Sequence, residues 1–382
     1  MKIQFLGGIT PQEFLNEYWE KKPLLIRGAV EDTESLASVD EIKELAFDEH
    51  FETRIVYNDK NKVKVKHGPL KSSDFDSSKW TFVCHNLNTI SDDFHSLQEK
   101  VNFIPTFLFD DVMATYSKEN STIGAHIDKY NVFILQGSGK RLWRLQESPD
   151  PTYDETKELK ILKNFNPTIE WLLEPGDMIY IPSSVAHEGF TVEESISYSI
   201  GFKSLEDQVI IDHFLTDCLE NIETEDYLKL HNLEHQEDSS LISKKIVCKI
   251  EDQIKKNFLE SNFIKNWIIS HLSKPKESID PGTIYLEEEI LEISKDSAIF
   301  KDTLTRFNSY QEEDDYILSI NKDLYRLSAH HYKLVSTWFK KPFGEEINID
   351  FKKLDYETWP LLIDLFKKGT FYFSQTEEPL SS

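Results

Sequence analysis

Short runs of branched and aromatic residues recur between residues 54 and 202, and turn residues separate them. The runs cover residues 54–57, 63–65, 80–83, 106–109, 132–136, 141–145, 178–181 and 196–202. Gly137-Ser138-Gly139 and Pro175-Gly176-Asp177 are the clearest turn signals between them. Because the runs have the length and composition of strands, we expect a barrel or sandwich of the jelly-roll kind.

Helical patterns stand on both sides of this β region. Residues 10–13 form a capping box with proline at the first helical position, and Phe14, Tyr18 and Trp19 give that helix an apolar face. Further along, an apolar residue falls at every fourth position of residues 242–258, as in an amphipathic helix. This stripe packs either within the chain or against a second copy, and we predict a homodimer.

The charge of the chain narrows the choice of partner. The 382 residues include 68 acidic and 43 basic ones, which gives a formal net charge of −25. Phosphate backbones are poor partners for such a surface, so we expect no direct DNA binding. A basic macromolecule fits better, although acidity can also serve solubility alone. The aromatic content of 12% can fill a core, which excludes a disordered chain.

The sequence carries no sign of secretion or of a membrane span. No apolar run approaches the roughly 18 to 20 residues that cross a bilayer. The first residues lack the basic start and apolar stretch of a signal peptide. The cysteines at 84, 218 and 248 form no CxxC pair, so we expect neither a disulfide framework nor a structural zinc site. These features predict a cytoplasmic protein.

Three residues have the pattern of a metal site. His126 and Asp128 are two apart, so on an extended segment their side chains share a face. His187 follows a short apolar strand, on a loop where a rigid barrel presents ligands. Two imidazoles and one carboxylate on one face of a metal are typical of non-haem Fe(II) oxygenases. A second match, His235-Gln236-Glu237, has no β pattern around it, and we interpret it as a polar turn.

A 2-oxoglutarate oxygenase also needs a cation for the distal carboxylate of the cosubstrate. Arg141 fits, because it starts the strand after the Gly-Ser-Gly turn and arginine can bind a carboxylate bidentately. Lys140 competes for this role, but strand alternation places the two side chains on opposite faces. Ser117 could donate a hydroxyl to the same carboxylate.

Several segments closely resemble the JmjC-type ribosomal oxygenases, whose bacterial branch is the YcfD-like (RoxA) arginyl hydroxylase group. The segments are YWEKKPLLIRGA at 18–29, PTFLFDDVM at 105–113, HIDKYNVFILQGSGKRLWRL at 126–145 and EPGDMIYIPSSVAHEGFT at 174–191. The strong resemblance covers roughly residues 5–205. It implies an Fe(II)-dependent enzyme that uses 2-oxoglutarate and O₂. By position, His126, Asp128 and His187 would be the metal ligands, and Arg141 and Ser117 would hold 2-oxoglutarate.

The resemblance also implies a fold and a division into domains. We expect an α+β chain with a double-stranded β-helix (jelly-roll/cupin, JmjC) barrel as catalytic domain in residues 1–205. A helical dimerisation region would occupy 206–275. A small winged-helix-like C-terminal domain would occupy 276–382.

The same resemblance implies a basic ribosomal protein as substrate. The bacterial members hydroxylate an arginine Cβ of the large-subunit protein L16, and the eukaryotic relatives hydroxylate histidines of other ribosomal proteins. This sequence departs from the family pattern at Lys140, where a second arginine is frequent, and at Asn131, where close relatives carry an acid. Tyr130, Asn131 and Ser195 are candidate substrate contacts near the expected mouth of the barrel.

Other functions stay open on the sequence alone. A histidyl hydroxylase, a demethylase and a tRNA hydroxylase would share the oxygenase chemistry, but the negative charge disfavours tRNA. A small-molecule cupin metalloenzyme would need no 2-oxoglutarate. An acidic binding module without metal is disfavoured by the intact set of three ligands.

Overall fold

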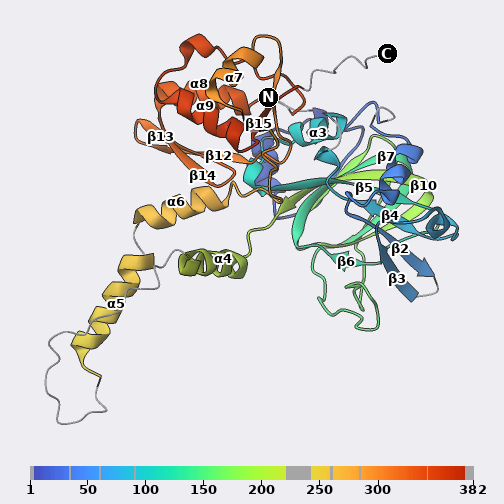
Figure 1. Ribbon diagram of the computed structural model, residues 1–382. Helices are drawn as coiled ribbons and strands as arrows, with labels where there is room; N and C mark the ends of the chain where they lie inside the picture. Colours follow the sequence, from blue (N-terminus) through green and yellow to red (C-terminus); the bar gives the residue numbers. More distant parts are fainter. Residues whose placement is uncertain are drawn as a thin grey trace. The chain divides into compact units, whose positions relative to one another are not determined.

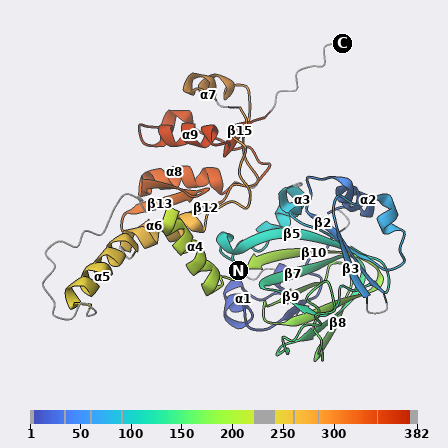
Figure 2. The same cartoon turned by 60° about the horizontal axis from the view of Figure 1, so that its bottom comes forward.

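The computed structural model of the chain (Figures 1 and 2) describes residues 4–33, 36–59, 62–89, 92–220, 242–258, 261–283, 285–341 and 343–374. The chain divides into two compact units, Met1–Ser204 and Leu205–Ser382. No helix among the described residues is long and apolar enough to cross a membrane. The predicted second boundary, at 275/276, stays a prediction. The HQE sequence at 235–237 lies outside the described residues.

The first unit is built on one ten-stranded sheet, with the strand order β1-β9-β7-β10-β5-β4-β2-β3, β6 beside β10 and β8 beside β7. The strands are β1 (Leu24–Ile26), β2 (Thr53–Asp59), β3 (Lys62–His67), β4 (Thr81–Cys84), β5 (Phe109–Ser117), β6 (His126–Ile127), β7 (Tyr130–Gln146), β8 (Ile169–Leu173), β9 (Met178–Ile181) and β10 (Ala186–Lys203). Among the described residues, three α-helices accompany the sheet: α1 (Pro11–Glu17), α2 (Val39–Glu44) and α3 (Asp92–Glu99). All strand pairs are antiparallel.

The two long strands β7 and β10 run through the curved sheet (Figure 1), and both contribute lining residues to one cavity. The second half of β10 pairs with β5 and with the first half of β7, whereas its first half pairs with β6 and the second half of β7. The sequence predicts a turn at Gly137-Ser138-Gly139, which is wrong: β7 continues through it. Gly139 has φ +63°, and a Cβ there would lie 2.0 Å from the carbonyl oxygen of Glu194. This glycine lets β10 approach closely where the register between β7 and β10 shifts.

One face of this sheet packs on the main hydrophobic core. Its strands alternate, so that Phe82, Ala114, Tyr116, Phe133 and Tyr198 point into the core, while their neighbours face the cavity. The helix predicted from the capping box forms as α1, where Thr10 accepts a hydrogen bond from the backbone N–H of Glu13. Figure 2 shows α1 beside the strands, and its buried Phe14 contacts the rings of Phe133 and Tyr180.

The predicted strand at 106–109 is also placed too early. Residues Thr106–Leu108 form a 3-10 helix, and the strand runs over Phe109–Ser117. Asp110 and Asp111, which directly follow the predicted strand, lie inside β5. Asp111 is buried, and its carboxylate accepts one hydrogen bond from the backbone N–H of Asn86 and pairs with the ring of His85.

The second unit contains α4 (Asp207–Glu220), α5 (Lys244–Phe258), α6 (Ser261–His271), α7 (Glu287–Ile293), α8 (Ala329–Phe339) and α9 (Thr358–Lys367). Its strands are β11 (Ile299–Lys301) paired with β15 (Phe371–Phe373), and a three-stranded sheet of β12 (Phe307–Glu312), β13 (Asp315–Ile320) and β14 (Asp323–Ser328). These elements share a second hydrophobic core that includes Trp338, Leu362 and Phe366. The winged-helix assignment of this region stays a prediction.

Candidate active site

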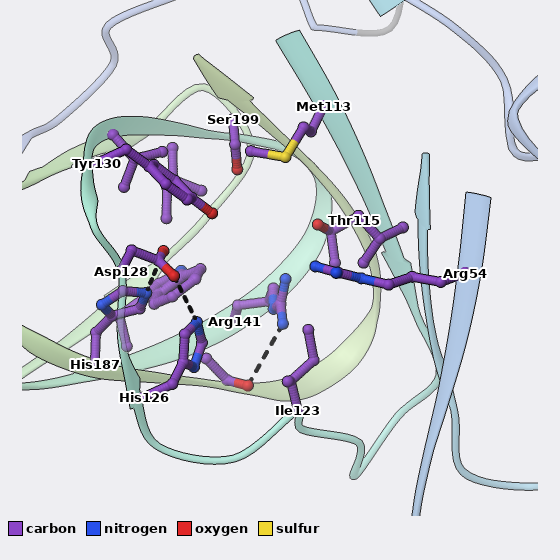
Figure 3. A pocket seen from close by; sticks show the side chains of 15 residues that line it. Arg54, Met113, Thr115, Ile123, His126, Asp128, Tyr130, Arg141, His187 and Ser199 are labelled. Carbon is purple, nitrogen blue, oxygen red and sulfur yellow. Dashed lines mark hydrogen bonds and ion pairs between the residues drawn. The ribbon is translucent and has the colours of Figure 1, made fainter. Parts of the chain in front are cut away.

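Three side chains meet at one end of the cavity (Figure 3). His126 lies on β6 and His187 lies opposite it on β10, because these residues are register partners. Asp128, in the short link from β6 to β7, points between the two rings. Its Oδ1 lies 3.6 Å from Nε2 of His126, and its Oδ2 lies 3.4 Å from Nε2 of His187. One donor atom from each residue lies within 4.8 Å of the others.

The second nitrogen of each ring fixes its orientation. Nδ1 of His126 lies 2.9 Å from the carbonyl oxygen of Gly124, and Nδ1 of His187 lies 3.1 Å from that of Val185. A carbonyl oxygen only accepts, so in the neutral rings Nδ1 carries the proton and donates it. The lone pairs of both Nε2 atoms therefore face Asp128. Two imidazole nitrogens and a carboxylate, oriented by outer hydrogen bonds, are a suitable donor set for a divalent transition metal.

The charges of these groups are strongly coupled. Burial lowers the pKa of His126, and the positive charges of His187 and Arg54 act in the same direction. Burial alone would also lower the pKa of His187, but the hydrogen bond and charge of Asp128 outweigh it and raise that pKa. Burial would raise the pKa of Asp128, but the two histidines and a hydrogen bond from Tyr130 lower it instead. The carboxylate is therefore ionised at neutral pH, as a metal ligand must be.

The metal donors share their cavity with a buried arginine. The lining residues are Arg54, Val83, Met113, Thr115, Ile123, His126, Asp128, Tyr130, Val132, Ile134, Arg141, Trp143, His187, Gly189 and Ser199. Arg141 is 3% exposed, and its Nη1 donates to Oγ of Ser197 at 3.0 Å, while Nη2 donates to the carbonyl oxygen of Gly189 at 3.4 Å. Its guanidinium also lies over the ring of Trp143.

No carboxylate of the described residues pairs with Arg141, and its buried Nε has no hydrogen-bond partner. Burial lowers the pKa of Arg141 to about 10, which still leaves the group charged at neutral pH. A buried cation without a counter-ion is costly. A ligand carboxylate in the cavity would relieve that cost, so the residues present fit 2-oxoglutarate as well as a metal.

Lys140 is placed as strand alternation predicts, on the other face of β7. Its ammonium group lies 3.2 Å from a carboxylate oxygen of Glu174 and 3.4 Å from one of Glu193. Lys140 is absent from the cavity lining, so Arg141 alone of these two cations faces the metal donors.

Ser117 does not line the cavity, whereas Thr115 does. Both project from the same face of β5, but Ser117 lies two residues further along the strand and is fully buried. Its Oγ donates a hydrogen bond to Oγ1 of Thr81 at 3.0 Å. Ser195 is the register partner of Ser117 and is equally buried. The next row holds Thr115 and its partner Ser197, which binds Arg141. The sequence reasoning missed these two hydroxyls, because the alternation of β5 places Thr115 on the same face as Ser117 without choosing between them.

Of the other predicted substrate contacts, Tyr130 lines the cavity and Asn131 does not. Asn131 points to the opposite face of β7, where its Oδ1 accepts hydrogen bonds from the hydroxyl of Tyr180 at 3.0 Å and from the backbone N–H of Ser183 at 3.3 Å. It is fully buried. Its position therefore indicates a role in holding β7 against β9 and the loop that leads to His187.

Comparison with known proteins identifies the domain around this site. Residues 96–209 match the family model described as JmjC domain. The chain carries a JmjC domain. The match contains His126, Asp128, His187, Arg141 and Thr115, so all three candidate metal ligands lie within the JmjC domain.

The chain is homologous to proteins named as ribosomal oxygenases. It is 26% identical over 298 residues to the ribosomal protein uL16 3-hydroxylase of Escherichia coli, which covers 75% of this chain and 78% of that protein. It is 33% identical over 202 residues to a probable ribosomal oxygenase of Haemophilus influenzae, which covers 51% of this chain and 50% of that protein. The chain thus matches only half the length of the second relative.

Solved structures agree on the fold. The X-ray structure of E. coli YcfD superimposes with a TM-score of 0.81 at 22% identity and covers 96% of this chain and 98% of that one. A structure of the same protein in complex with cobalt and 2-oxoglutarate superimposes with a TM-score of 0.77 at 22% identity, over the same shares of both chains. The predicted JmjC/cupin-type fold is confirmed at this level.

Proposed function

We propose that this protein is an Fe(II)- and 2-oxoglutarate-dependent oxygenase that hydroxylates a side chain of a ribosomal protein. The observation that carries the proposal is the content of one cavity: three converging metal donors and a buried guanidinium without a counter-ion. The homology to proteins named as ribosomal oxygenases supports the substrate class.

Different residues of the cavity would bind the metal and the cosubstrate. His126, Asp128 and His187 would hold Fe(II), and Arg141 would bind a carboxylate of 2-oxoglutarate through the guanidinium that Ser197 and Gly189 orient. Bound together, Fe(II) and 2-oxoglutarate supply the activation of O₂ that inserts one oxygen atom into a C–H bond. The charges of His126 and His187 and the hydrogen bond from His187, with a smaller contribution from the hydrogen bond of Tyr130, keep the Asp128 carboxylate ionised.

Within this reaction we propose arginine Cβ of the large-subunit protein uL16 as the target. The E. coli relative is named a uL16 3-hydroxylase. The net charge of −25 suits a basic ribosomal protein, because opposite charges accelerate encounter. A histidine of another ribosomal protein is the alternative, since a more distant relative, 24% identical, is named as a histidyl-hydroxylase. Such a reaction belongs in the cytoplasm, where ribosomes work.

We also propose that the protein is a homodimer through the helical region 206–275. Helix α5 leaves Val247, Ile250 and Ile254 each more than 40% exposed, and the preceding Ile242 is 70% exposed. Helix α4 likewise exposes Ile211 and Leu219. Exposed apolar side chains in such numbers are typical of an interaction surface.

The test of the chemistry is succinate formation from 2-oxoglutarate in the presence of ribosomal proteins. It should require Fe(II) and should be lost in His126→Ala. The exposed His67 on β3 provides a matched control, and His67→Ala should retain turnover. Turnover in His126→Ala, or turnover without added metal in a chelated preparation, would contradict the proposal.

A further inference from the structure

A second arginine faces the cavity from outside the JmjC match. Arg54 lies on β2, whereas the matched residues begin at 96. Its side chain lines the cavity, and Figure 3 shows its guanidinium directed toward Thr115. No motif singled it out in the sequence.

Arg54 belongs to the same cross-strand row as the hydroxyls of the cavity. It is the register partner of Val83 on β4, Val83 is the partner of Thr115 on β5, and Thr115 is the partner of Ser197 on β10. Residues opposite one another on neighbouring strands project to the same face. Two strand spacings separate Arg54 from Thr115, about 10 Å between the backbones. An extended arginine side chain spans most of that distance.

Two guanidinium groups therefore converge on this row from its two ends. Arg141 reaches it by the hydrogen bond to Ser197, and Arg54 enters it from β2. Like Arg141, Arg54 has a buried Nε without a hydrogen-bond partner. No carboxylate of the described residues forms an ion pair with either arginine. Among the described residues that line the cavity, Asp128 is the single carboxylate, and it interacts with the two histidines and Tyr130.

We infer that Arg54 is a second carboxylate-binding residue of this cavity, which binds, with Arg141, the distal carboxylate of the dicarboxylate cosubstrate. The inference rests on the proposed function. A carboxylate offers four lone-pair sites on two oxygens, so it can accept hydrogen bonds from two guanidinium groups and a hydroxyl together. The alternative, an acidic side chain of the protein substrate, fits less well, because the buried Nε of Arg54 lies in the row of Thr115 and Ser197.

Two guanidinium groups at the distal carboxylate would make the cavity selective for 2-oxo dicarboxylates. The test compares the dissociation constants of 2-oxoglutarate and of 2-oxopentanoate, which has the same chain without the distal carboxylate. Calorimetric titration of the Mn(II)-loaded full-length protein measures both without turnover. The variants are Arg54→Met, which keeps the apolar stem, and Arg54→Lys, which keeps the charge. Arg144→Met is the matched control, because Arg144 on β7 pairs with Glu170 and Glu188 outside the cavity.

In Arg54→Met the dissociation constant of 2-oxoglutarate should rise at least about tenfold, while that of 2-oxopentanoate stays within about twofold. Arg54→Lys should fall between wild type and Arg54→Met, and Arg144→Met should match wild type. Unchanged 2-oxoglutarate binding in Arg54→Met, or equal weakening of both ligands, would overturn the inference. If Arg54→Met does not fold, the same comparison is decided by Arg54→Lys and Arg54→Gln.

Arg141→Met separates this inference from the proposed function. Weaker 2-oxoglutarate binding in Arg141→Met with no change in Arg54→Met would overturn the role of Arg54 alone. A wild-type protein that binds Mn(II) but not 2-oxoglutarate would overturn the proposed function itself.

Discussion

Thr115 and Ser117 project from the same face of β5, and only Thr115 reaches the cavity. We predict that Thr115→Val, which removes the hydroxyl and keeps the shape, raises the dissociation constant of 2-oxoglutarate by about 3- to 10-fold. Ser117→Ala should leave that constant unchanged. It should instead lower the free energy of unfolding by about 1 kcal/mol, because the buried Oγ1 of Thr81 loses its partner. Ligand titration and thermal unfolding of both variants measure these effects, and the reverse assignment of effects would contradict the placement.

Arg141 and Lys140 are neighbours with opposite surroundings. Arg141 is buried in the cavity without a counter-ion, and Lys140 is paired with Glu174 and Glu193 on the outside. Arg141→Met should therefore weaken 2-oxoglutarate binding by about 10- to 100-fold. Lys140→Met serves as its matched control and should bind 2-oxoglutarate like wild type. Equal losses in both variants would show that the two cations act together.

The affinity for metal should fall as the pH falls, and protonation of His187 should determine the pH at which this loss begins. The pKa of His187 is raised above the usual value of about 6.5, because the interaction with Asp128 outweighs the effect of burial. Its proton therefore competes with the metal near neutral pH. The pKa of His126 is lowered, so this ring titrates only at more acid pH. Co(II) titrations from about pH 8 to pH 5.5 should show weaker binding on the acid side.

Asp128→Asn provides the control for this pH dependence. It should bind Co(II) more weakly at every pH, because a charged ligand is lost. The pH at which Co(II) binding begins to weaken should also be lower in this variant, because the group that raises the pKa of His187 is gone. If Co(II) binding to this variant begins to weaken at the same pH as in the wild type, a group other than His187 determines the pH dependence.

The proposed dimer depends on the apolar face of α5. Ile250→Asp with Ile254→Asp places two charges on that face, where both side chains are more than 40% exposed. This double variant should be monomeric at micromolar concentrations where the wild type is a dimer, as measured by light scattering after size exclusion. Glu251→Gln with Lys255→Gln, two exposed polar positions on the same helix, should remain dimeric. A monomeric wild-type protein would contradict the dimer directly.

The sequence predicts the parts of this site that depend on local spacing, but not those that depend on which strands pair with one another. The spacing of His126 and Asp128 and the loop before His187 predict the three converging side chains that the structure contains. Strand alternation also separates Arg141 from Lys140 correctly. Alternation alone cannot choose between Thr115 and Ser117, because both share one face and differ only in depth. That choice depends on which row of neighbouring strands each residue joins.

Arg54 shows the same limit more strongly. It lies 72 residues before His126 in the sequence and enters the cavity only because β2 pairs with β4 and β4 with β5. The turn predicted at the Gly-Ser-Gly segment is wrong for a related reason. Its glycines look like a turn, but tertiary pairing with β10 keeps the strand continuous and uses the left-handed φ of Gly139 for close approach.

The most direct test of the central claim is mass spectrometry of ribosomal proteins after incubation with the full-length protein, Fe(II), 2-oxoglutarate and O₂. We expect one added oxygen atom on a single large-subunit protein, uL16, located at an arginine Cβ by fragmentation. The product should be absent with His126→Ala and present with His67→Ala. An oxygen on a histidine of another ribosomal protein would contradict the arginine assignment and keep the oxygenase. No added oxygen on any ribosomal protein, in a preparation that binds both metal and 2-oxoglutarate, would contradict the claim that this enzyme acts on the ribosome.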